Sequence, residues 1–195
     1  MGRSFLRAAV LGLALTTLSV GAAGPQAIDL HGTARTGATP AANVVVWLDA
    51  PNAPAAARGK VVLDQRNLAF SPQVLAVRVG TTVDFPNNDR VLHNVFSFRD
   101  GKRFDLGMYP VGALKRVTFD RPGLSRIFCN IHPNMAAYLM AVDSPFFAVS
   151  DTYGNFTIAS VPPGNYPYHA WRAGAPDLTG TWTSGAAQPF TLDWP

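Results

Sequence analysis

Short apolar or alternating runs, separated by turn residues, recur along most of the chain. The runs most typical of strands cover residues 43–48, 61–63, 74–79, 83–85, 95–98, 115–119, 125–129 and 137–142. Tight-turn signals lie between several of them, such as Gly80 and the pair Pro122-Gly123. Several short strands at this spacing are typical of a β-sandwich or barrel. The pattern therefore predicts an all-β fold.

Other segments carry weaker or different signals. Residues 32–42 form a turn-rich stretch, and residues 100–108 are compatible with a short helical turn. Residues 147–150 and 155–158 predict a hairpin, and residues 166–171 alternate like a strand. Pro167 lacks a backbone donor, so it indicates an edge position for that strand. The tail to Pro195 is weakly strand-like.

The N-terminus has the pattern of a secretory signal peptide. Arg3 and Arg7 precede an apolar run over residues 8–20, and the small residues Gly21-Ala22-Ala23 follow it. The run is short for a bilayer span, which disfavours the alternative of a membrane anchor. We therefore expect cleavage after residue 23, export to the periplasm, and no membrane span once the signal is removed.

Composition and charge narrow the classes of function. The chain is 48% hydrophobic and 14% charged, as expected for a folded protein. Its formal net charge of +4 falls to about +2 (4 − 2) when Arg3 and Arg7 leave with the signal. Lysines and arginines are scattered rather than clustered, so no nucleic-acid partner is expected.

The residues most able to bind a metal or to act in catalysis include the single cysteine, Cys129, and two residues close to it in sequence. Cys129 cannot form an internal disulfide, so it is a buried inert thiol, an intermolecular link or a ligand. His132 and Met135 follow it at intervals of three residues, and His93 lies 36 residues upstream (129 − 93). Two imidazoles, a thiolate and a thioether form the donor set of a blue-copper site. A thiol nucleophile with a histidine base lacks an orienting third group here, and a methionine ligand suits copper better than zinc.

The remaining histidines are too few for a larger copper enzyme. His31 and His169 are the only others in the chain, and both are interpreted as surface or interface residues. Multicopper oxidases and copper nitrite reductases need additional histidine-rich centres. We therefore expect one copper ion and no enzymatic activity.

Residues 67–142 contain Phe70-Ser71-Pro72, Gly80-Thr81-Thr82-Val83, Phe85-Pro86-Asn87-Asn88-Asp89, His93-Asn94-Val95 and the C-x-x-H-x-x-M loop over residues 129–135. With these elements the segment resembles small cupredoxins of the amicyanin-like and plastocyanin-like group. The resemblance implies a Greek-key β-sandwich in which His93, Cys129 and His132 are equatorial copper ligands and Met135 is the axial one. It also implies that Asn94 braces the ligand loop.

The flanking segments resemble a second kind of module. The hairpin Asp151-Thr152-Tyr153-Gly154-Asn155-Phe156 and the turn Pro162-Pro163-Gly164 are similar to the second half of carboxypeptidase regulatory-like (transthyretin-like) modules. Residues 32–34 and 43–48 would supply the first half, although residues 43–48 could instead be the first cupredoxin strand. The resulting expectation is a signal peptide (1–23), a cupredoxin domain (59–143), and one carboxypeptidase regulatory-like module split into residues 24–58 and 144–195.

This layout resembles exported proteins labelled methylamine-utilisation proteins. The function expected from the resemblance is a periplasmic type 1 copper protein that carries single electrons, with a dehydrogenase or a c-type cytochrome as candidate redox partners. Two alternatives stay open. One is a periplasmic copper carrier or copper-resistance protein, and the other is a non-catalytic β-sandwich binding module.

Overall fold

The computed structural model describes residues 26–50, 53, 60–98 and 100–195. The predicted signal peptide (1–23) and most of the segment 51–59 lie outside these residues. The described part contains eighteen strands and no helix, which confirms the all-β fold class. Nor does this part contain a helix long and apolar enough to cross a membrane.

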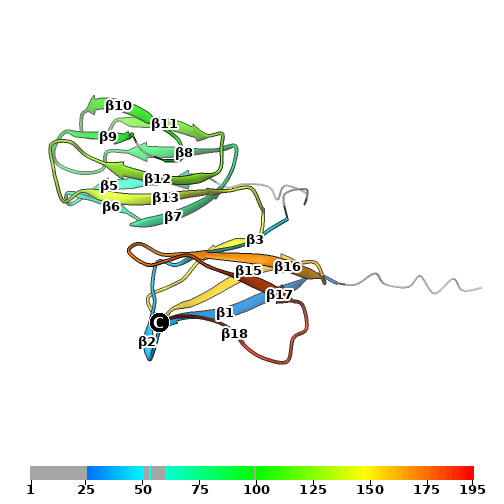
Figure 1. Cartoon of the computed structure of the whole chain (residues 1–195). Helices are drawn as coiled ribbons and strands as arrows, with labels where there is room; N and C mark the ends of the chain where they lie inside the picture. The colour runs from blue at the N-terminus through cyan, green and yellow to red at the C-terminus, as the bar shows by residue number, and fades with distance from the viewer. Residues whose placement is uncertain (1–25, 51–52, 54–59, 99) are drawn as a thin grey trace, which may run out of the picture.

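Ten consecutive strands form a sandwich that we call the central sandwich (Figure 1). Its larger sheet has the order β10-β9-β12-β13-β7, and the facing sheet has the order β11-β8-β4, with the hairpin β5-β6 beside them. The strands are β4 (Val61–Val62), β5 (Asp64–Arg66), β6 (Ala69–Ser71), β7 (Val74–Arg78), β8 (Thr81–Pro86), β9 (His93–Ser97), β10 (Phe104–Tyr109), β11 (Leu114–Phe119), β12 (Gly123–Phe128) and β13 (Ala136–Val142).

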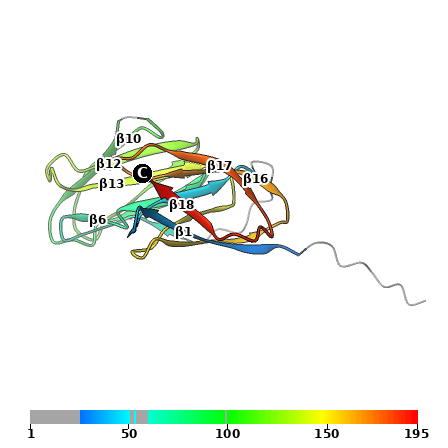
Figure 2. The same ribbon diagram turned by 60° about the horizontal axis from the view of Figure 1, so that its bottom comes forward.

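The remaining strands come from both ends of the chain and form the terminal sandwich, drawn below the central one in Figure 1. Its sheets have the orders β15-β1-β18, with β2 added to β1, and β14-β3-β16-β17. Figure 2 shows β1 and β18 side by side, in agreement with their parallel pairing. The strands are β1 (Ile28–Thr36), β2 (Thr39–Pro40), β3 (Val45–Leu48), β14 (Phe147–Val149), β15 (Asn155–Val161), β16 (Asn165–Trp171), β17 (Leu178–Thr183) and β18 (Phe190–Trp194).

Strand β3 explains why residues 44–48 form an unbroken apolar run. Val46 and Leu48 belong to the core of the terminal sandwich, whereas Val45 and Trp47 face a second apolar cluster toward the central sandwich. A strand buried on both faces reads as continuous rather than alternating hydrophobicity. The strand pairs with β14 and β16, and not with β7 as a first cupredoxin strand would.

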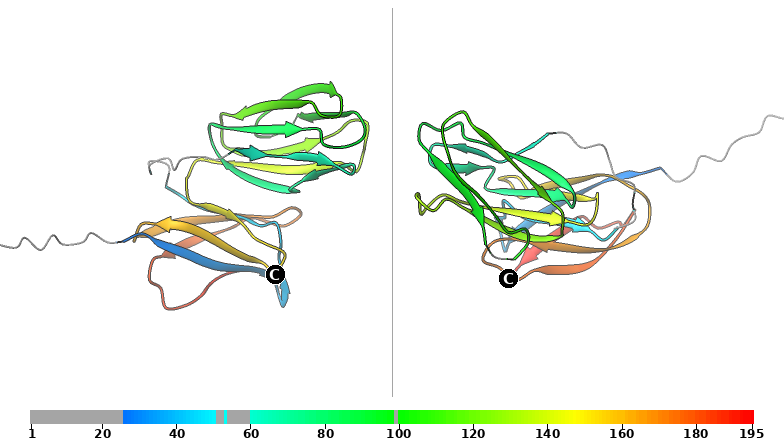
Figure 3. Two further views of the ribbon diagram at one scale, coloured as in Figure 1. Left: turned by 180° about the vertical axis from the view of Figure 1, so that it is seen from behind. Right: turned by 90° about the horizontal axis from the view of Figure 1, so that it is seen from above.

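Strand β13 is buried on both faces in the same way. Leu139 packs into the core of the central sandwich, while Met140 and Val142 contact the terminal sandwich. The Tyr138 and Trp171 rings meet across this junction with their centroids 5.2 Å apart. The two sandwiches therefore meet through apolar side chains, and the left view of Figure 3 shows them stacked.

Three local expectations from the sequence are wrong. Residues 32–42 are not mainly turns, because β1 and β2 occupy most of them and the turn between these strands covers only residues 37–38. Residues 100–108 hold no helical turn, because β10 pairs with β9 over Phe104–Tyr109. Strand β16 is not an edge, because it lies between β3 and β17.

Pro167 is tolerated in this central strand for a geometric reason. Its carbonyl accepts a hydrogen bond from the backbone N–H of Asp49, at 2.8 Å. The N–H and C=O of one residue in an antiparallel strand point to the same side. The donor that proline lacks would therefore face Asp49, one residue beyond the end of β3 at Leu48, so the proline costs a hydrogen bond only at the end of this ladder.

Candidate metal centre

The candidate ligands come from one strand start and one tight loop at the same end of the central sandwich. His93 is the first residue of β9, and Cys129 directly follows β12. The loop from Cys129 to Met135 closes on itself through two backbone hydrogen bonds. These run from Cys129 N–H to the Met135 carbonyl, at 3.2 Å, and from Met135 N–H to the His132 carbonyl, at 2.9 Å. Three donor side chains are thereby fixed on seven consecutive residues.

The donor atoms of His93, Cys129 and His132 lie within 4.8 Å of one another. The two Nδ1 atoms are 3.1 Å apart, and Cys129 Sγ lies 3.9 Å from Nδ1 of His93 and 3.5 Å from Nδ1 of His132. Three donors from residues up to 39 positions apart thus converge on one point. The structure brings together the three residues that the sequence predicts as equatorial ligands.

Burial differs among the candidate ligands in a way that matters for chemistry. His93, Cys129 and Met135 have exposed fractions of 0%, 4% and 1%, and Cys129 and Met135 belong to the core of the central sandwich. His132 is only partly buried. The imidazole of His132 is therefore the candidate ligand that a second molecule can approach.

Asp89 fixes the protonation of the buried histidine. Its Oδ2 lies 2.9 Å from Nε2 of His93. An ionised carboxylate only accepts hydrogen bonds, so Nε2 carries the proton and Nδ1 keeps its lone pair toward Cys129 and His132. Carboxylate partners of this kind orient metal-binding histidines and raise their basicity.

The carboxylate of Asp89 is itself held in its ionised form. The backbone N–H of Leu68, and then that of Arg90 and the His93 ring, lower the pKa of Asp89 to about 2 against the opposing effect of burial. The side chain of Asn87 places this segment, because it accepts from Asp89 N–H at 3.1 Å and donates to the Val91 carbonyl at 2.9 Å. Asp89 was not among the predicted site residues; its signal in the sequence is a carboxylate four residues before His93, within a turn.

Asn94 links the two halves of the centre. Its Oδ1 accepts from the backbone N–H of Asn130, at 3.3 Å, and its Nδ2 donates to Asp105, at 2.8 Å. The segment after His93 is thereby tied to the loop after Cys129. The bracing role expected for Asn94 is confirmed for its contact with this backbone group.

A buried polar network lies next to the centre. Gln65 Nε2 donates to Tyr109 Oη at 2.5 Å, and Tyr109 Oη donates to the Phe85 carbonyl at 3.1 Å. Burial raises the pKa of Tyr109 to about 12, so the phenol stays protonated. Tyr109 also pairs with His93 across β10 and β9, which gives the site a rigid neighbour. Sequence reasoning had not identified Gln65 or Tyr109.

The two other histidines lie in the terminal sandwich, away from the centre. His31 is on β1 and has Nδ1 3.0 Å from the hydroxyl of Thr157. His169 is on β16, where its Nε2 lies 2.9 Å from Asp49 Oδ2 and its ring stacks on Trp47. Neither belongs to a metal-binding group among the described residues.

The donor chemistry defines the class of site. Two imidazoles, one thiolate and one thioether, supplied by His93, Cys129, His132 and Met135, fit a single type 1 copper site. The thiolate and thioether suit Cu(I), and the imidazoles serve both oxidation states. Burial of three of the four side chains limits the access of water to the centre.

Several solved structures share part of this fold. A copper-containing nitrite reductase from Thermus scotoductus SA-01 matches with 27% identity and a TM-score of 0.42, over 47% of this chain and 24% of that one. A purple cupredoxin from Nitrosopumilus maritimus matches with 25% identity and a TM-score of 0.38, over 44% of this chain and 100% of that one. A reduced mutant of amicyanin matches with 22% identity and a TM-score of 0.41, over 50% of this chain and 98% of that one.

Comparison of the amino-acid sequence with known families and curated proteins gives no match. The structural matches cover half of the chain or less, and the chain covers about a quarter of the nitrite reductase. The function is therefore argued from the geometry of the site itself.

Proposed function

We propose that this protein is a periplasmic electron carrier that holds one type 1 copper ion through His93, Cys129, His132 and Met135. The observation that carries the proposal is the convergence of the donor atoms of His93, Cys129 and His132 within 4.8 Å. Met135 closes the same loop through backbone hydrogen bonds. When bound, a type 1 copper supplies one-electron redox chemistry.

The protein's own residues suit a centre that keeps its shape. The hydrogen bond of His93 to Asp89 and the bond of Asn94 to the Asn130 backbone hold the ligand segments in place before any metal arrives. Pro133 restricts the backbone beside His132. A preformed site of this kind needs little rearrangement when the charge of the metal changes.

The surface around His132 supports exchange with another protein. Among the described residues, seven of the ten exposed large hydrophobic side chains lie on segments that adjoin the ligand-bearing segments in the chain, or that pair or hydrogen bond with them or with the turn before His93. They are Leu68, Val91, Leu92, Met108, Val111, Leu114 and Ile131. Contiguous exposed apolar surface marks interaction sites on soluble proteins. We infer that a redox partner, with a dehydrogenase or a c-type cytochrome as candidates, docks over His132.

The proposal includes the domain organisation and the location. A cupredoxin domain over residues 59–143 would be inserted in a carboxypeptidase regulatory-like module formed by residues 24–58 and 144–195. The pairing of β3 with β14 and β16 supports this division. The Asp151–Gly154 turn supports it too, because Asp151 Oδ1 accepts from the N–H groups of Tyr153 and Asn155, at 2.8 Å each. Export to the periplasm rests on the signal-like residues 1–23.

The deciding experiment follows copper and electrons separately. The purified chain is given one equivalent of Cu(II), and its visible spectrum is recorded before and after reduction. We expect an intense thiolate-to-copper absorption that bleaches reversibly, together with rapid electron exchange with a c-type cytochrome. Absence of the absorption would contradict the copper site.

A second measurement separates electron transfer from copper delivery. The copper form is mixed with an apo copper acceptor, and the metal content of both proteins is followed over time. We expect the copper to stay with this chain while electrons exchange. Rapid and quantitative transfer of the metal would instead favour a copper carrier.

A further inference from the structure

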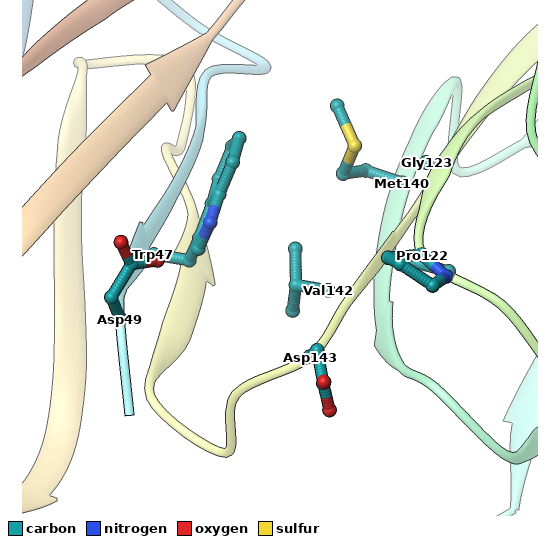
Figure 4. A pocket seen from close by; sticks show the side chains of 8 residues that line it. Trp47, Asp49, Pro122, Gly123, Met140, Val142 and Asp143 are labelled. Carbon is teal, nitrogen blue, oxygen red and sulfur yellow. The ribbon is translucent and has the colours of Figure 1, made fainter. Parts of the chain in front are cut away.

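A cleft of about 430 Å³ lies between the two sandwiches, away from the metal centre. Trp47 and Asp49, from the terminal sandwich, form one wall, and the opposite wall comes from the central sandwich (Figure 4). That opposite wall consists of Pro122, Gly123, Met140, Ala141, Val142 and Asp143. A volume of this size lies within the range of small-molecule sites.

The indole of Trp47 is held in a fixed position. The His169 ring stacks on it with centroids 5.0 Å apart and an angle of 13° between the planes. Asp49 accepts from His169 at 2.9 Å and so anchors the stacked imidazole. Because His169 covers one face of the indole, the other face is the one open to the cleft. In Figure 4 the Trp47 ring stands opposite Met140 and Val142.

The charged side chains that line the cleft determine whether it favours a cationic or an anionic ligand. Asp49 and Asp143 are exposed at the cleft, and no lysine or arginine is among the described residues that line it. Arg121, beside Pro122 in the chain, lies 3.8 Å from Asp120. Arg78, opposite Val142 on β7, donates to the Ala53 carbonyl at 3.1 Å. The lining itself therefore presents two negative groups and no positive one.

The two sandwiches carry net charges of opposite sign: residues 60–142 have a net charge of +5 (11 − 6), so only the terminal sandwich, which supplies the Trp47 wall, adds to the negative charge of the lining. Residues 26–50 and 143–195 contain two arginines and six aspartates, which gives a net charge of −4 (2 − 6) with neutral histidines. An aromatic face attracts a cation placed over it, and the attraction strengthens when the cation is partly desolvated. Apolar neighbours such as Met140 and Val142 favour a ligand whose charge is surrounded by carbon.

We propose that this cleft binds small organic ammonium ions, with the cation over the free face of Trp47 and the carboxylates of Asp49 and Asp143 nearby. The site is independent of the metal centre, because none of its lining residues is a candidate ligand. Its occupant would contact β3 and β13 at once and so bridge the two sandwiches. An anion would lack a complementary group there.

The test compares a cation with its neutral carbon isostere. Choline and 3,3-dimethyl-1-butanol have nearly the same shape and differ by the positive charge. Each is titrated into the full chain at constant ionic strength, with the indole N–H resonances followed by NMR. We expect saturable binding of choline that shifts the Trp47 resonance, and binding of the isostere that is at least about tenfold weaker.

Variants locate the site. Trp47→Leu should weaken choline binding about tenfold, whereas Tyr153→Leu, which removes an aromatic side chain that is 76% exposed elsewhere in the terminal sandwich, should leave it unchanged. Because Trp47 also packs in the interface, Asp143→Asn provides a second variant at an exposed position, with an expected loss of up to about fivefold. Circular dichroism of each variant checks the fold.

Three outcomes would overturn the proposal. Equal affinity for choline and its isostere would show an apolar crevice without selection for charge. Binding that survives both Trp47→Leu and Asp143→Asn would place the ligand elsewhere. No saturable binding of choline at any accessible concentration would remove the site altogether, and none of these results would bear on copper binding by Cys129.

Discussion

The carboxylate of Asp89 accepts a hydrogen bond from His93 with its Oδ2, at 2.9 Å, and the same oxygen accepts from the backbone N–H of Leu68 at 2.7 Å. One atom thus ties the buried imidazole to the β5–β6 turn. The negative charge of this carboxylate would increase the electron density that Nδ1 of His93 donates to a bound copper ion.

The first prediction concerns this carboxylate. Asp89→Asn keeps a side chain of similar shape but removes the charge that makes the imidazole a stronger donor. We expect Cu(II) affinity to fall by about 10–100-fold and the reduction potential to rise. Competition with a chelator and a potentiometric titration measure the two quantities. Asp120→Asn, a surface change in the same sandwich, should alter neither; an unchanged potential in Asp89→Asn would contradict the role.

Cys129 should be the source of the colour. Cys129→Ser replaces the thiolate by a hydroxyl of similar size, so we expect the intense visible absorption to disappear while the far-ultraviolet circular dichroism stays that of a β protein. Cys129 is the only cysteine in the chain, so no second thiolate can substitute. Persistence of the absorption in this variant would end the type 1 assignment.

Met135 should tune the potential more than it holds the metal. The axial ligand of a type 1 site is a weak, long donor. Met135→Leu keeps a similar volume in a position that is 1% exposed. We expect the variant to bind copper and to have a higher reduction potential, because a donor to Cu(II) is lost. Complete loss of copper, or an unchanged potential, would argue against the axial role.

The stability of the central sandwich should depend on pH through Asp84. The hydrogen bond from Arg116, opposed by burial and supported by Lys60, lowers the pKa of Asp84 from its usual 3.8. Because the carboxyl has the lower pKa in the folded state, its stabilising effect is present above pH 3.8 and is lost as the pH falls through the folded-state pKa.

Urea unfolding of the apoprotein tests this dependence. Arg116→Gln should lower the free energy of unfolding at pH 7, and the difference from the wild type should shrink at pH values below 3.8. Arg126→Gln, in a more exposed pair whose nearest atoms are 3.8 Å apart, should have a smaller effect. A difference that stays constant down to pH 2 would exclude the Arg116–Asp84 pair as the cause.

Gly154 should be needed for the close contact between the β14–β15 turn and β1. Its φ is +78°, and an added Cβ would lie 2.2 Å from the Ala34 carbonyl oxygen. Gly174 has nearly the same φ, +77°, with nothing within 4 Å. We expect Gly174→Ala to cost ~1–2 kcal/mol from backbone strain alone. Gly154→Ala should cost clearly more, as measured by thermal unfolding, and equal losses would mean that the contact can relax.

The sequence was most informative at the metal centre, where the residue types themselves indicate metal binding. The order and spacing of His93, Cys129 and His132 predicted a common site, and the geometry brings their donor atoms together. The apolar run of β3 also predicted a buried strand correctly. The run is continuous because both faces of the strand are covered by apolar clusters.

The sequence was least informative where tertiary contacts override local preference. Strand β1 contains Gly32, a poor strand former, but an added Cβ there would lie 2.3 Å from the Phe156 ring, so the ring takes the space. Strand β10 contains Gly107 at a positive φ and a shift in register, which together obscure its alternation. Asp89 could not be assigned from spacing alone, because its role depends on where the turn places its oxygens.

The two strands that are buried on both faces set a limit on how the chain can be divided. If the central sandwich were produced alone, Met140 and Val142 would become an exposed apolar stripe, and Val45 and Trp47 would do the same for the terminal sandwich. Each half would then be prone to aggregate unless those positions were changed to polar residues. The backbone amides of β3 and β13 should accordingly be among the last to exchange with deuterium, because each strand is paired on both sides and its side chains are covered on both faces.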